Sequence, residues 1–122
     1  MKLGSLILIL AVLIPGIALA ADVMDWEQAG SNMDKRAIVE GRIQNSECKP
    51  NACYLNFHRD AGDKKRFAVI IYVFDLREFP PDPDRYYRGK SVRVTGTIRD
   101  NKGIPSIVVK KKAAIEEMEK RK

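Results

Sequence analysis

The stretch Tyr87–Val109, YRGKSVRVTGTIRDNKGIPSIVV, decides the fold class of this chain. Within Ser91–Asp100, apolar or small residues alternate with polar ones, which is the period-two pattern of a strand with one buried and one solvated face. The polar residues and the glycine of Asp100–Gly103 predict a turn, and Ile104–Lys110 continues as a second β-branched strand. Pro105 has no N–H to donate, so we expect it near a strand start or a sheet edge. The stretch therefore predicts a hairpin in an all-β protein.

The N-terminal 20 residues have the organisation of a cleavable signal peptide. Lys2 precedes a largely apolar run, Leu3–Ile14, and a Pro-Gly break follows before the small residues of Ala18–Ala20. Signal peptidase accommodates small residues before the cleaved bond, so we expect cleavage after Ala20 and a periplasmic or secreted protein. The alternative is an uncleaved anchor, because the 19 residues of Leu3–Ala21 approach the length that spans a bilayer. The Pro-Gly break beside a small-residue site favours cleavage.

The length that remains after cleavage limits the domain organisation. Loss of 20 of the 122 residues leaves enough chain for one domain with one modest core. We expect a signal peptide over 1–20, an N-terminal arm over 21–34, a β domain over 35–110 and a basic C-terminal helix or tail over 111–122. The formal net charge of +6 favours polyanionic partners such as nucleic acid or anionic lipid, but basic surfaces also occur without such a partner.

The two ends of the expected domain carry weaker patterns. Ala21–Asp34 has no clear period and is compatible with either a mobile arm or a short helix whose Trp26 fills part of the core. Within Ala113–Lys122, two Glu residues are each followed four positions later by a basic residue. Pairs with this spacing and order stabilise helices, so we expect a short C-terminal helix.

The cysteines of this chain are Cys48 and Cys53, which flank the sequence Lys-Pro-Asn-Ala. Export would place them where disulfides persist, so we predict a bond between them. A loop this short stabilises the fold by about 2 kcal/mol in the chain-entropy model. The spacing differs from the CxxC of thiol oxidoreductases, and no second Cys or His pair is present to complete a zinc site. A structural disulfide is therefore favoured over a redox or metal role.

Three further strands are predicted before the hairpin. Ala37–Ile43 alternates and contains Gly41, which indicates a bend or bulge. Tyr54–His58 alternates as well, and Arg66–Phe74 is apolar on nearly both faces, as a central strand would be. A short crossover then precedes the hairpin. Five strands in this order predict a small five-stranded Greek-key barrel.

Several motifs carry a resemblance to a known fold family. They are Val39-Glu40-Gly41-Arg42-Ile43, Tyr54-Leu55-Asn56-Phe57, Phe67-Ala68-Val69-Ile70-Ile71, Tyr87-x-Gly89-Lys90-x-Val92-x-Val94-x-Gly96 and Gly103-x-Pro105-x-Ile107. The chain from Lys35 to Val109 resembles OB-fold domains of the tRNA-anticodon-binding and single-strand-binding type, in particular small exported bacterial versions. The resemblance implies an OB-fold barrel and binding of single-stranded nucleic acid, although OB barrels also bind oligosaccharides and proteins.

The resemblance also implies where a ligand would bind. The usual OB surface is the outer face of the second and third strands with its flanking loops. Alternation then gives a set of outward or flanking candidates for nucleic-acid binding: Tyr54, Asn56, His58, Lys64, Lys65, Arg66, Tyr72, Arg99 and Lys102, with Lys49 beside them. The tyrosines would stack on bases and the basic residues would contact phosphates. Alternatively, the tyrosines cover the barrel edge under one of the terminal segments, and the lysines are merely solvated at hairpin ends.

Catalytic and metal sites are not predicted. His58 with Asp60 and Asp63 forms a possible divalent-metal site, but aspartates in such a position more often form the turn itself, so we expect no metal and no cofactor. No Ser, Cys or Thr lies in a recognisable nucleophile motif. We therefore expect a non-enzymatic protein that binds single-stranded DNA, RNA or an oligonucleotide. The competing hypothesis is a periplasmic protein-interaction or envelope-stress module that binds a protein or small ligand.

Overall fold

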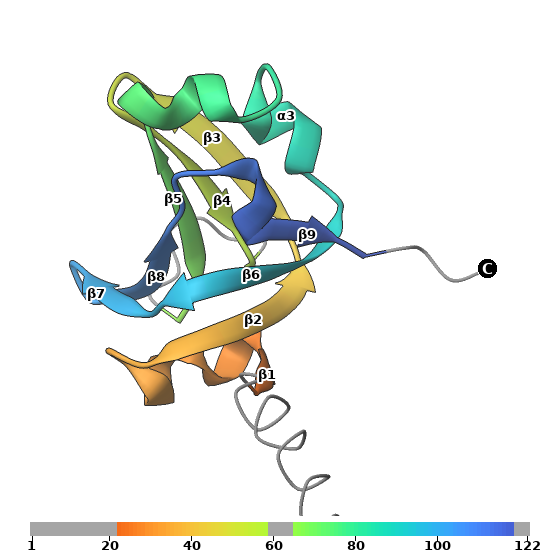
Figure 1. The fold of residues 1–122 in the computed structure, drawn as a ribbon. Coiled ribbons are helices and arrows are strands. Elements are labelled where there is room, and N and C mark those ends of the chain that lie inside the picture. Colours follow the sequence, from red (N-terminus) through yellow and green to blue (C-terminus); the bar gives the residue numbers. More distant parts are fainter. Residues whose placement is uncertain (1–21, 59–64, 119–122) are drawn as a thin grey trace, which may run out of the picture.

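The computed structural model describes residues 22–58 and 65–118, which are mostly β (Figure 1). Two sheets, with strand orders β1-β2-β6-β9 and β3-β4-β5-β8-β7, pack around one core. The strands are β1 (Val23–Asp25), β2 (Arg36–Arg42), β3 (Asn45–Lys49), β4 (Ala52–Asn56), β5 (Ala68–Tyr72), β6 (Ser91–Thr97), β7 (Arg99–Asn101), β8 (Ile104–Val108) and β9 (Ile115–Glu117). The short helices are the 3-10 helices η2 (Trp26–Asn32), η3 (Val73–Glu78) and η4 (Lys112–Ala114) and the α-helix α3 (Pro83–Tyr87).

The fold is OB-like, but its hydrogen-bonded ladders form two sheets instead of the closed five-stranded barrel that we predicted. The chain bends after the first predicted strand, β2, and continues as β3, which was not predicted, whereas the fourth predicted strand bends and divides into β6 and β7. At the first bend the backbone N–H of Gln44 donates to the carbonyl of Asn56 at 3.0 Å, so the chain passes directly from one sheet to the other. The parallel pairing of β5 with β8 completes the second sheet.

The predicted hairpin is present, although it is shorter than expected. Only Arg99–Asn101 pairs with β8, because the chain leaves the first sheet at the buried Ile98. The turn residues Lys102 and Gly103 both have positive φ, at 54° and 89°, which matches the twist of a two-residue hairpin loop. The N–H of Gly103 donates to the Asp100 side chain at 3.0 Å. The expected turn chemistry is therefore confirmed.

The two sheets approach each other most closely where β6 crosses β8. A β-carbon on Gly96 would lie 2.5 Å from Cγ2 of Ile107, which is far below van der Waals contact. Cγ2 is attached directly to the β-carbon of a fully buried isoleucine, so it moves only if the whole side chain changes rotamer. Glycine is required at position 96 for packing.

The N-terminal segment is part of the folded domain, which decides between the alternatives left open by the sequence. Val23–Asp25 pairs in parallel with β2, and Asp25 caps η2. Trp26 is half-buried and packs against the core, where a β-carbon on Gly41 would lie 2.5 Å from the Trp26 ring. Gly41 continues the β2 ladder opposite Val92, so the predicted bend lies after Arg42, not at the glycine.

The C-terminal helix predicted over 111–122 is wrong for the residues that the structure describes. Lys112–Ala114 forms one 3-10 turn, and Ile115–Glu117 is strand β9, which pairs with β6. Ile115 is 4% exposed and belongs to the core. Burial of this side chain outweighs the weak helical preference of the Glu pairs, whose basic partners lie outside the described residues.

The crossover between β5 and β6 is anchored to the first bent strand. α3 begins at Pro83, as a helix starting with proline can, and leads to Tyr87, which is fully buried. Arg88 Nη2 donates to the carbonyl of Ser46 at 2.6 Å, and Nε donates to its hydroxyl at 3.1 Å. The Ser46 hydroxyl in turn donates to the carbonyl of Asp84, so β3 and α3 are fastened together.

A polar cluster holds β9 against the same crossover. The Tyr86 hydroxyl donates to the Glu117 carboxylate at 2.5 Å, and Lys90 Nζ lies 3.7 Å from the other carboxylate oxygen. The hydrogen bond from Tyr86 lowers the pKa of Glu117 below its ordinary value, with Lys90 adding to the effect. The same hydrogen bond raises the pKa of Tyr86.

Replacement of Gly96 tests the packing of the two sheets. Gly96→Ala should destabilise the fold by roughly 1–3 kcal/mol, because the added methyl group overlaps Ile107. The matched control is Gly30→Ala, whose β-carbon would meet Pro105 at an ordinary 3.9 Å. That variant should be neutral or more stable by about 0.4–1 kcal/mol. Urea unfolding followed by circular dichroism measures both variants, and equal stabilities would contradict the packing described.

The pKa shifts at the β9 cluster predict a pH window. A carboxylate with a lowered folded-state pKa stabilises above its ordinary pKa of 4.5, and this contribution is lost as the pH falls through the folded value. A tyrosine with a raised pKa stabilises below its ordinary 10.0, and this is lost as the pH rises through the folded value. Tyr86→Phe should therefore lower the unfolding free energy between these limits and progressively less outside them. A difference from wild type that does not vary with pH would refute the assignment.

Candidate functional site

The outward face of the second sheet carries the two tyrosines singled out from the sequence. Tyr54 on β4 lies opposite Ile70 on β5, and Ile70 lies opposite Val108 on β8. Tyr72 lies opposite Ala52, so the tyrosines occupy diagonal positions on neighbouring strands of one face, within reach of each other's large side chains. Both are half-buried. The residues that alternate with the outward candidates are buried core: Leu55, Phe57, Phe67, Val69 and Ile71.

A third aromatic residue, which the sequence analysis missed, extends this pair. Phe74, in the first turn of η3, stacks on Tyr72 with ring centroids 5.8 Å apart and planes inclined by 14°. Phe74 is 70% exposed, the largest value among the exposed large hydrophobic residues described. The spacing of two residues from Tyr72 was the available signal, because continued alternation would place both rings on one face. We call Tyr54, Tyr72 and Phe74 the aromatic strip.

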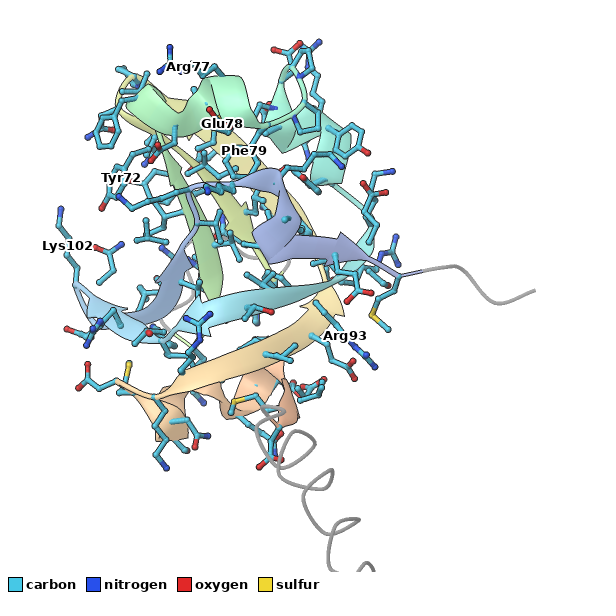
Figure 2. The ribbon with its side chains drawn as sticks, in the orientation of Figure 1. Tyr72, Arg77, Glu78, Phe79, Arg93 and Lys102 are labelled. Atoms are coloured by element: carbon cyan, nitrogen blue, oxygen red, sulfur yellow. A yellow bond between two sulfur atoms is a disulfide. The ribbon has the colours of Figure 1, made fainter. Side chains whose placement is uncertain are left out.

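Basic side chains lie around the aromatic strip. Lys49 Nζ lies 5.7 Å from the centroid of the Tyr54 ring, within cation–π range, and 3.8 Å from the Glu47 carboxylate. Lys102 is exposed at the tip of the β7–β8 hairpin, and Figure 2 shows it on the same side of the molecule as Tyr72, with Arg93 on the opposite side. Arg99 is exposed on β7.

Other predicted candidates are less accessible than expected. Asn56 faces outward by register but is 2% exposed, and Arg66 Nε donates to its side-chain oxygen at 3.2 Å. The half-buried Arg66 is therefore committed to holding Asn56, and the expectation that Asn56 is accessible to a ligand is wrong. Asn56 lies on a strand with a partner on each side, and neighbouring side chains can cover such a position, which alternation alone does not reveal.

The remaining candidates lie near the β4–β5 connection. The His58 ring packs edge-on against Trp26, with centroids 6.0 Å apart, at the N-terminal side of the domain. Lys65 is exposed, and Lys64 lies outside the described residues. The structure therefore brings Tyr54 and Tyr72 together with Phe74 and Lys49, and it places His58 against a different neighbour.

Cys48 and Cys53 are joined by a disulfide, as predicted, across the hairpin of β3 and β4. Their α-carbons are 3.9 Å apart. Since the residues are directly opposite in the ladder, the bond closes the hairpin that presents Lys49 and Tyr54. The disulfide therefore constrains the hairpin that carries Tyr54 of the aromatic strip.

The residues of the metal hypothesis lie only partly within the described part of the chain. Asp60 and Asp63, the aspartates of the metal hypothesis, lie outside it. Within residues 22–58 and 65–118, no group of three or more His, Cys, Asp or Glu side chains is placed to hold a metal ion. No described helix combines the length and apolarity needed to cross a membrane.

Comparison with known proteins identifies the fold but no family. No protein-family model matches the chain, and no curated protein sequence is significantly similar to it. An aspartyl-tRNA synthetase from Leishmania major Friedlin has a similar structure at 14% identity and a TM-score of 0.52, covering 81% of this chain and 21% of that one. The aspartyl-tRNA synthetase from Entamoeba histolytica has a similar structure at 11% identity and a TM-score of 0.52, and the match covers 88% of this chain and 24% of that one. The chain thus spans under a quarter of each synthetase, and the likeness supports an OB-like fold alone.

Proposed function

We propose that this protein binds single-stranded nucleic acid on the outward face of its second sheet. The observation that carries the proposal is the stacking of the exposed Phe74 on the half-buried Tyr72, which lies diagonal to Tyr54. Exposed aromatic rings on an OB-like sheet provide stacking platforms for successive bases, which are the usual means of binding single strands without strong sequence preference. A partly exposed ring pair gains its largest additional burial from a flat, aromatic ligand.

The charge of the protein supports the same partner. The chain has a formal net charge of +6, and Lys49, Lys102 and Arg99 lie on the loops and strands that flank the strip. Neutralisation of phosphates by such residues releases counterions, so binding weakens as salt increases. The two synthetases compared above are named for a nucleic-acid substrate, tRNA, which supports a nucleic-acid role for this chain.

We also propose that the protein acts after export and without catalysis. The apolar N-terminal run ending in Ala18-Leu19-Ala20 supports signal cleavage after Ala20 and a periplasmic or secreted location. A bond between Cys48 and Cys53 is compatible with an oxidising compartment. Binding of an extracellular or periplasmic oligonucleotide by stacking and charge needs no nucleophile, general base or cofactor.

A protein partner is the second candidate, and the exposed apolar side chains favour it. Val73 is 48% exposed and Val108 is 38% exposed, and both lie near Phe74 or on the same sheet face. Apolar residues gathered at the surface are typical of interaction sites. In this alternative the same face contacts an envelope protein, and the rings fill pockets on that partner.

Aromatic substitutions test the proposed function. Tyr72→Ala and Phe74→Ala should each weaken binding of a labelled oligothymidylate by roughly 1–3 kcal/mol, because each removes one stacking ring. Tyr72→Phe is the matched control, because it keeps the ring and loses only the hydroxyl. Fluorescence anisotropy of the protein purified after expression of the full chain measures the affinities.

Circular dichroism of the same variants separates binding from folding. The alanine variants should keep the wild-type spectrum, because both side chains lie on the outward face. If wild type does not bind the single strand at low salt, or if Tyr72→Ala and Phe74→Ala bind as wild type does, the nucleic-acid proposal fails. The protein-partner alternative then becomes the working hypothesis.

A further inference from the structure

A second surface feature lies beside the aromatic strip and was not anticipated from the sequence. It is an open groove of about 430 Å³ between β6, the end of β8 and the segment that leads into η4. We call it the basic groove, after the side chains that line it: Arg36, Thr95, Thr97, Arg99, Lys110 and Lys111. The strands and the crossing segment that form it can be followed in Figure 1.

The charge of the groove is one-sided. Among the described residues that line the groove, four are basic and none is acidic. Arg36, Lys110 and Lys111 are exposed at the surface. Arg99 pairs with Asp34, whose carboxylate lies 3.1 Å away, and both of these side chains are more than half exposed. An exposed pair of this kind contributes little stability, so an anionic ligand can replace Asp34 as the partner of Arg99.

The backbone on both sides of the groove is held in place. Lys110 follows Val109, whose N–H donates to the Ile70 carbonyl at 3.0 Å, and Lys111 accepts a backbone hydrogen bond from Ala114 at 3.1 Å. On the opposite wall, Thr95 and Thr97 face outward from β6 between the buried residues of that strand. Lysine, arginine and threonine side chains are the common donors to phosphate oxygens. The groove therefore presents phosphate-binding groups from a fixed frame.

Val108 connects the groove to the aromatic strip through the strand register. It lines the groove and pairs with Ile70, a buried residue that pairs in turn with Tyr54. Neighbouring strands are about 4.8 Å apart, so Val108 lies about 10 Å from Tyr54 across the sheet. That span is compatible with the several nucleotides that one OB domain binds.

We propose that the basic groove binds the sugar-phosphate backbone of the single strand whose bases stack on the aromatic strip. This inference rests on the proposed function and adds the path of the ligand: from the strip, over Val108, and into the groove. The aromatic strip offers stacking to bases, which lipid headgroups lack, and this favours nucleic acid over an anionic membrane. Of the basic candidates predicted from the sequence, Arg99 lines the groove and Arg66 does not.

The test removes two charges from the groove and compares their loss with that of two charges elsewhere. The groove variant is Lys110→Ala/Lys111→Ala. The control variant is Arg42→Ala/Arg85→Ala, which removes the same net charge from exposed positions, one on α3 and one at the end of β2 remote from Arg36. Affinity for labelled oligothymidylate is measured over a range of salt concentrations with the protein purified after expression of the full chain.

Loss of two phosphate contacts should weaken low-salt binding at least about tenfold and reduce the slope of log K against log salt by about 1.4. The control should keep the wild-type slope. Lys110→Arg/Lys111→Arg keeps both charges and should restore the wild-type slope, which excludes misfolding as the cause. The inference is overturned if the groove variant has the slope of the control.

Two further arms separate this inference from the proposed function. If wild type binds the oligonucleotide and Tyr72→Ala weakens binding while the groove variant behaves as the control, the path is wrong and the proposed function stands. If wild type does not bind, both are wrong. Vesicles containing phosphatidylglycerol form the lipid arm. Loss of vesicle binding by the groove variant, with an unchanged oligonucleotide slope, would overturn the inference in favour of a lipid headgroup.

Discussion

The close approach of β6 to β8 at Gly96 is the constraint on which the rest of the structure depends. A side chain at this position would overlap Ile107, and only its absence lets the first sheet pack on the second. Two residues later the chain turns at Ile98, whose N–H donates to the Lys35 carbonyl and whose carbonyl accepts from the Asp34 N–H. The same strand then continues as β7 in the other sheet. One strand thus joins both sheets and sets the position of β8.

The two candidate binding features follow from this arrangement. β8 lies beside β5 with Val108 facing outward, so the end of β8 lies on the sheet face that carries Tyr54 and Tyr72 of the aromatic strip. The chain then returns over β6 to form β9, and the core side chain of Ile115 holds this return in place. Lys110 and Lys111 lie on the returning segment and face the outward threonines of β6 across the basic groove. Packing inside the domain therefore arranges both the aromatic rings and the cations outside it.

Much of the fold could be predicted because strand side chains alternate and turns need particular residues. The buried faces of β4 and β6, the turn at Lys102–Gly103 and the Cys48–Cys53 bond all follow from local sequence. The C-terminal strand could not be predicted, because burial of Ile115 depends on a partner distant in sequence. Local helical pairing therefore pointed to the wrong element. For the same reason the sequence left open whether Trp26 packs on the core beside Gly41.

Only part of the candidate site could be predicted from the sequence. Alternation placed Tyr54 and Tyr72 correctly on one face, but it could not show that Asn56 is covered and bound by Arg66. Phe74 was missed although alternation along the predicted strand would have placed it on the face of Tyr72; in the structure the strand ends at Tyr72, and a 3-10 turn brings the Phe74 ring onto its neighbour. The basic groove joins residues from β2, β6, β7 and the segment after β8, so no single motif contains it.

Mapping of backbone amide chemical shifts tests the central claim most directly. The labelled protein, purified after expression of the full chain, would be titrated with an unlabelled oligothymidylate and, separately, with a duplex of equal length. The account predicts the largest shifts at Tyr54, Tyr72 and Phe74 with the single strand, and weaker shifts with the duplex, because paired bases do not expose their faces for stacking. Shifts confined to α3 and β9, or no shifts with the single strand, would contradict a nucleic-acid-binding face on the second sheet.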